Sequence, residues 1–219
     1  LNAYASEVYH AEVNTLIDSS NSTSGITEFR IIANMEEGNF VSLDDENGFG
    51  YSVDNIHPST PDDVMASASD NNVNISWDYS QDIDFDYHQV TELEELQFTI
   101  SNDVSVILLK EYNEYYMNSV DIHDNYSDKS DYVGAHDLHE GANLIGVCVL
   151  PEDNSVGNVL SGPLEGIIGE GVAASNNPAM GWVGSLTGIN SSDGYWFKAS
   201  EETIHLTVGD KYEAESFEL

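Results

Sequence analysis

Alternating hydrophobic and polar positions predict β-strands along most of the chain, and Val73, Ile75 and Trp77 form the clearest case. Their spacing places three large apolar side chains on one face of a half-buried strand. Upstream, Pro58 and Pro61 cannot donate ladder hydrogen bonds and hold their predecessors in extended geometry, as in a stiff linker that enters an edge strand. The pattern predicts a junction between two β-sandwich modules.

Two segments with similar alternation predict a loose internal repeat. In the first, Phe29, Ile31 and Ala33 would point inward; in the second, the inward set would be Tyr115, Met117 and Ser119. The repeat spans 86 positions, the distance from Phe29 to Tyr115. This length is close to that of one small β-sandwich.

The last third of the chain changes character after residue 136. Residues 143–150 predict a buried strand, because residues 144–150 form a continuous apolar run. Ser155 is placed to cap one short helix that ends at Leu160. Four β segments punctuated by glycine follow, at residues 166–174, 181–186, 194–198 and 203–208. We therefore expect an all-β fold with one short helix.

Composition and charge narrow the class of partner. The 219 residues are 40% hydrophobic, enough for packed cores, and 40 Asp and Glu against 5 Lys and Arg give a net charge of −35. Nucleic acids and anionic membranes would be repelled, since the few cations are scattered singly. So large a charge is best tolerated where salt or divalent cations screen it, which favours saline extracellular surroundings.

The sequence also indicates whether the protein is membrane-bound or exported. No apolar run reaches the roughly 20 residues needed to span a bilayer, so we expect no membrane insertion. Leu1 begins no charged and then apolar leader, and we expect an export signal to have been removed or to lie outside this segment. The single cysteine, Cys148, lies in the apolar run and is expected to be a small core residue.

Residues 58–135 resemble a fibronectin type III domain. The resemblance rests on the Pro-x-x-Pro entry, on Trp77, on the segment Asp84-Phe-Asp-Tyr87, and on residues 115–127. It implies an immunoglobulin-like sandwich over residues 57–135, in which Trp77 is the buried core tryptophan and Tyr115 the tyrosine-corner residue.

The flanking segments resemble related modules. Residues 1–56 are similar to the later half of another such domain, with Phe29 in its core; either a longer protein was cut, or another chain supplies the missing strands. Residues 136–219 resemble a small β-rich module, with a Gly-Tyr-Trp ending, that follows fibronectin-like repeats in large exported surface proteins of marine bacteria, including those exported by type IX secretion.

One acidic loop is a candidate cation site. Asp82, Asp84 and Asp86 alternate there, and calcium binds several carboxylate and carbonyl oxygens at close range. The glycine and terminal glutamate of an EF-hand loop are missing, so diffuse cation screening is the competing interpretation. His136 and His139 would suit a metal by spacing alone, but solvated linker histidines explain them as well.

Aromatic residues near the end of the chain are a candidate glycan platform. Trp182, Tyr195 and Trp196 could stack against a sugar ring, and of these Tyr195 is expected to be exposed, followed by Trp182 as a ligand residue. Because adjacent strand residues point to opposite faces, core packing of one member of each pair is the alternative.

No sequence signature of catalysis is present, so we expect no enzyme activity and no cofactor beyond possible calcium. The predicted function is a non-catalytic, secreted structural or adhesive segment at a cell surface, part of a filament or a multidomain protein. It could form homopolymers through strand or domain contacts. Two alternatives are a carbohydrate-binding accessory region of a longer secreted enzyme, and a virion fibre or decoration protein.

Overall fold

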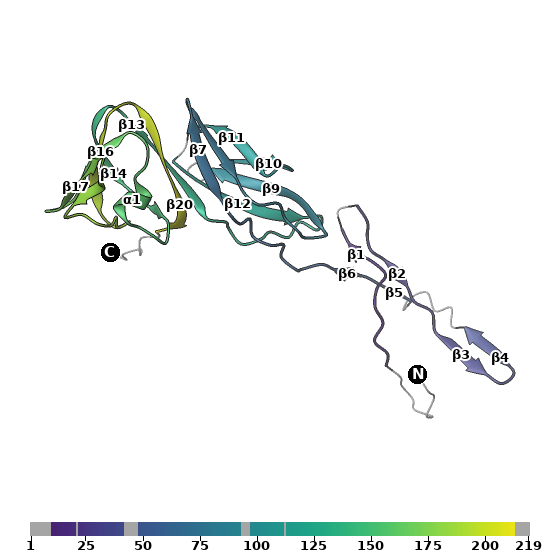
Figure 1. Cartoon of the computed structure of the whole chain (residues 1–219). Coiled ribbons are helices and arrows are strands. Elements are labelled where there is room, and N and C mark those ends of the chain that lie inside the picture. Colours follow the sequence, from purple (N-terminus) through teal and green to yellow (C-terminus); the bar gives the residue numbers. More distant parts are fainter. Residues whose placement is uncertain (1–9, 21, 42–47, 93–96, 112, 213–219) are drawn as a thin grey trace, which may run out of the picture. The chain divides into compact units, whose positions relative to one another are not determined.

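A computed structural model describes residues 10–20, 22–41, 48–92, 97–111 and 113–212. The chain forms two compact units (Figure 1). The first unit comprises residues 1–56 and 122–125, and the second comprises residues 57–121 and 126–219. Strands dominate both units, and the helix among the described residues is α1 (Val156–Val159). The all-β prediction with one short helix is confirmed.

The first unit is built from two-stranded ladders. One is a parallel pair and two are antiparallel: β1 (Asp18–Ser19) with β6 (Ser52–Val53), β2 (Thr27–Glu28) with β5 (Phe49–Gly50), and β3 (Ile32–Met35) with β4 (Gly38–Val41). Among the residues of this unit whose burial the structure describes, the buried ones are Gly25 and Thr27, and none is a large apolar residue. Ladders of this size provide no second layer against which an apolar face can pack.

This absence of a second layer overturns two expectations for the first repeat segment. Ile31 was expected to point inward, yet its side chain is 77% exposed. Phe29, expected in a core, is half-buried and lies between β2 and β3. Strands flank this segment, at β2 and β3, but burial requires a facing sheet that the described part of this unit lacks.

The second unit begins with two sheets that enclose one core. The smaller sheet has the strand order β11-β8-β7 and the larger has the order β10-β9-β12-β13-β20-β15. The strands are β7 (Met65–Ser69), β8 (Asn72–Ser76), β9 (Phe85–Glu92), β10 (Gln97–Ser101), β11 (Ser105–Leu109), β12 (Glu114–Asp121), β13 (Tyr132–Leu138), β15 (Val149–Leu150) and β20 (Thr203–Lys211). All pairs are antiparallel.

The core of this sandwich confirms the clearest sequence predictions. Val73, Ile75 and Trp77 are buried and pack in one cluster with Tyr115 and Met117. Ser119, the third inward residue of the second repeat segment, is also buried. Here period-two alternation produced burial because each sheet faces the other across the core.

A second core lies on the other side of the β13–β20 ladder. It is covered by a sheet with the order β14-β19-β16-β17-β18 and by α1, whose Val156 and Val159 are buried. The strands are β14 (Gly141–Gly146), β16 (Leu164–Ile168), β17 (Ala173–Asn177), β18 (Gly181–Gly184) and β19 (Gly194–Ala199). Ser155 precedes the helix as predicted, although its side chain makes no capping hydrogen bond.

The β13–β20 ladder is shared by both cores of the second unit (Figure 1). It runs from Tyr132 opposite Gly209 to Leu138 opposite Thr203 without a register shift. Alternate residues of the two strands serve opposite sides: Ala135 and Leu206 contact the sandwich core, whereas Leu138 belongs to the second core. The predicted boundary between residues 135 and 136 lies inside β13, and the division into domains stays a prediction.

Candidate functional site

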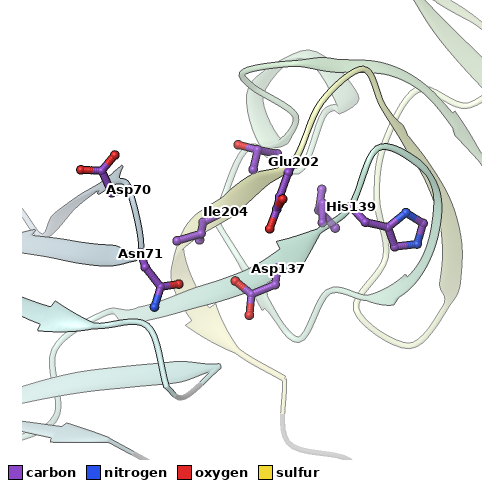
Figure 2. Close-up of a pocket in the computed structure, with 8 residues that line it drawn as sticks. Asp70, Asn71, Asp137, His139, Glu202 and Ile204 are labelled. Atoms are coloured by element: carbon purple, nitrogen blue, oxygen red, sulfur yellow. The ribbon is translucent and has the colours of Figure 1, made fainter.

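A cavity of about 730 Å³ lies between the β7–β8 turn and the ladder of β13 and β20. Figure 2 shows Asn71 on the turn and Asp137 and Ile204 on the facing strands, with Glu202 close by. Its lining residues are Asp70, Asn71, Asp137, Leu138, His139, Glu202, Thr203 and Ile204. Three carboxyl groups make the cavity acidic.

A buried lysine partly offsets this charge. The Lys110 side chain is 2% exposed, and its Nζ lies 3.3 Å from an Asp137 carboxylate oxygen and 3.2 Å from Asn113 Oδ1. His139 adds little, because its Nδ1 lies 2.7 Å from the Glu140 carbonyl oxygen and its ring lies away from Asp137 and Asn71 (Figure 2). With three carboxyl groups against one lysine ammonium, the cavity can attract cations.

A smaller pocket of about 220 Å³ reaches a buried histidine. His88 Nδ1 lies 3.5 Å from Ser119 Oγ, and within the described residues its Nε2 has no hydrogen-bond partner. Burial lowers the pKa of His88 to about 4, so the ring is neutral at physiological pH. A serine nucleophile needs a base that a third group orients, and no such group bonds Nε2. The absence of enzyme activity remains a prediction.

Two further histidines face each other across the β13–β20 ladder. His136 lies opposite His205, whose ring nitrogens are buried and have no partner in the described structure. Burial, followed by the neighbouring His136, lowers the pKa of His205 to about 4. For His136, burial and then the Lys110 charge lower the pKa, against opposing effects from Glu114 and Asp137. The sequence analysis missed His205, although alternation in residues 203–208 places it on the same face as Thr203 and Thr207.

The structure does not gather the predicted calcium residues into one group. The Asp82 carboxylate accepts hydrogen bonds from the Ser59 backbone N–H at 2.6 Å and from the Ser59 hydroxyl at 3.0 Å, which fixes the linker entry. Asp84 is half-buried before β9, and Asp86 is exposed on that strand. Calcium binding by these residues stays a prediction.

The predicted aromatic platform requires a correction. Tyr195, expected to be exposed, is 3% exposed, and its hydroxyl accepts a hydrogen bond from the Asn190 backbone N–H at 2.9 Å. Trp182 is half-buried and packs against the second core. The large aromatic residue on the outward face of β19 is Trp196, which is 49% exposed. Strand alternation predicts that either Tyr195 or Trp196 points inward. Which of the two does so depends on the position of the core that β19 packs against.

Trp196 is the centre of an outward-facing apolar row on the five-stranded sheet. Leu144 lies opposite it on β14 and Ile168 opposite it on β16, and both are more than half exposed. We call these three residues the Trp196 row. Beside it runs a groove of about 390 Å³.

No protein-family model matches this chain, and a search of curated proteins found no match. The described residues also contain no helix with the length and apolarity that a membrane crossing requires.

Proposed function

We propose that this chain is a non-catalytic, extracellular structural segment that spaces or anchors modules of a surface protein or filament. The observation that carries the proposal is the β13–β20 ladder, which joins two hydrophobic cores through one uninterrupted antiparallel pairing. A load applied to either core would pass through backbone hydrogen bonds of the same two strands. Rigid coupling of this kind suits a spacer.

The strand orders support the finer proposal that residues 57–135 form a fibronectin type III-like domain. One sheet has the order β11-β8-β7, and the larger sheet contains the order β10-β9-β12-β13. This is a two-sheet antiparallel sandwich in which Trp77 follows the second strand and Tyr115 lies on the penultimate one, and both are buried.

Charge and exposed apolar residues support the extracellular and assembly parts of the proposal. A net charge of −35 favours surroundings that contain salt or divalent cations such as calcium. In the first unit, Ile32 and Phe49 are exposed on short ladders that offer unpaired edges. A second copy of the chain is the partner we propose for these edges, through strand pairing.

Single-molecule pulling between residues 57 and 212 tests the mechanical role. We expect the wild-type second unit to resist force until the β13–β20 ladder breaks. Thr207→Pro removes a ladder donor from β20, because Thr207 pairs with Gly134 of β13, and should lower the unfolding force markedly. Ile32→Pro, in β3 of the first unit, is the matched control and should leave this force unchanged. Equal forces for wild type and Thr207→Pro, with both proteins folded, would contradict the proposal.

Two simpler experiments test location and assembly. Antibodies against the chain should label intact source cells, and labelling only after lysis would contradict an extracellular role. Light scattering and electron microscopy with and without calcium should reveal ordered polymers. A monodisperse monomer under both conditions would remove the filament form of the proposal and leave the spacer form.

A further inference from the structure

The Trp196 row gives the second unit an exposed apolar surface where the fold does not require one. In the five-stranded sheet, β19 lies between β14 and β16, so Trp196 has a neighbour on either side in register, Leu144 and Ile168. The inward residues of β19, Tyr195 and Phe197, already supply its contribution to the core. Large apolar side chains aligned on the solvent face of a sheet commonly mark a binding surface.

Next to the row, small residues leave room for a ligand. The groove has a volume of about 390 Å³. Four small residues on the outward face of the sheet line it, Ala142, Gly166, Ala173 and Ser175, and Trp196 also contributes to its wall. Its volume falls within the range of about 300–1,000 Å³ that ligand sites occupy. The site is therefore an open trough beside a flat aromatic ring.

The charges that line the trough cancel, unlike those of the chain as a whole. Among the described residues that line it, the charged ones are Glu165 and Lys198, and they neutralise each other in an ion pair of 2.7 Å. The chain as a whole carries a net charge of −35. A polyanionic ligand would be repelled by the whole protein, whereas a neutral ligand meets a locally neutral surface.

We propose that the Trp196 row and its trough bind a neutral oligosaccharide. The C–H face of a pyranose ring is apolar and would stack on the indole of Trp196. Its hydroxyl groups would bond the Glu165 carboxylate and the Lys198 ammonium at the edge of the trough. This inference deepens the adhesive part of the proposed function and rests on it, because it names what the segment would adhere to.

The first experiment measures binding of the purified chain to an array of neutral and anionic glycans, followed by titration with the strongest neutral oligosaccharide. Trp196 is more exposed than Trp77 and Trp182, so its fluorescence should shift or change intensity on binding. Trp196→Ala should weaken binding at least tenfold, and Trp196→Phe should weaken it less. In Trp196→Phe the fluorescence change should be lost, although calorimetry still detects binding.

Tyr79→Ala is the matched control. Tyr79 is an exposed aromatic residue of the same unit, but it does not line the trough. It should bind as wild type does. Gly166→Leu places a side chain in the trough and should reduce binding while the fold, checked by circular dichroism, is retained.

Three results would overturn the proposal: no neutral glycan bound on the array, equal affinity for wild type and Trp196→Ala, or dimers in sedimentation that disappear in Trp196→Ala. The last outcome would assign the row to contact with a second copy. The pulling experiment is independent of all three, because the β13–β20 ladder does not contain Trp196. Failure of glycan binding and failure of the mechanical role are thus distinguishable.

Discussion

The two units of this chain use the same alternation of apolar and polar residues and obtain opposite results. In the second unit, Ile75 and Tyr115 are fully buried between sheets, whereas in the first unit Ile32 and Phe49 remain exposed on short ladders. Alternation fixes which side chains share a face, but burial depends on whether a second layer covers that face. The comparison also predicts that the second unit holds most of the folding free energy.

The largest difference in stability between the two units should appear when a buried aromatic ring is removed from the second unit. Phe197→Ala deletes a fully buried side chain of the second core and should destabilise the second unit by about 3–5 kcal/mol. Ile31→Ala removes an exposed side chain and should cost less than about 0.5 kcal/mol. Urea unfolding followed by tryptophan fluorescence measures the first, because all three tryptophans lie in the second unit. Similar losses for both variants would abolish the contrast between the units.

Replacing one glycine in each unit tests whether close backbone packing stabilises the second unit more than the first. Gly209 in β20 has a φ of 150°, and a Cβ there would lie 2.2 Å from the Leu150 carbonyl oxygen, so Gly209→Ala should cost about 1–3 kcal/mol. Gly38 in β4 has a φ of 129° with open space around it, so Gly38→Ala carries only a torsional cost of about 1 kcal/mol. Thermal unfolding detected by tryptophan fluorescence should respond to the first substitution only. A response to both would show that the units unfold together.

Acid should destabilise the second unit through its buried histidines. The pKa of His205 is about 4 in the folded chain against an ordinary value of 6.5, so the unfolded chain binds the proton more readily. Stability that is present above pH 6.5 is therefore lost as the pH falls toward 4. At pH 5.5 His205 alone should account for about 1.4 kcal/mol, and His88 for a similar loss.

Urea unfolding at pH 7.5 and 5.5 checks this acid effect. His205→Leu should show about 1.4 kcal/mol less difference between the two pH values than wild type. If the variant kept the full pH dependence, His205 would be protonated in the folded chain and the burial argument would be wrong.

The smallest contrast concerns ion pairs. Asp137→Asn weakens the partner of the buried Lys110 ammonium and should cost about 0.5–1 kcal/mol, since Asp137 itself is exposed. Glu28→Gln in the first unit breaks an exposed pair with Arg30 and should change the stability by less than about 0.3 kcal/mol. Repeating the denaturation at high salt should shrink the first effect only partly. Complete loss in salt would indicate that Lys110 is accessible to solvent ions.

Much of the fold could be predicted because its signals are local. The strand around Val73 and the burial of Trp77 follow from spacing and side-chain size, and the short helix follows from its position after a turn. The candidate site was less predictable. Choosing between Tyr195 and Trp196 requires knowing which face of β19 meets the second core, and that core is assembled from strands more than 25 positions away, including β14 and β16.

The sequence by itself determined the all-β class, the strongly anionic surface and the face that each strand residue shares with its neighbours, because these depend on composition and on the period of two. The tertiary structure decided which faces became cores, that β13 and β20 would serve two cores at once, and that Trp196 would point to solvent. These outcomes depend on pairings between distant strands. Such pairings are selected by the fit of whole layers, which no local pattern contains.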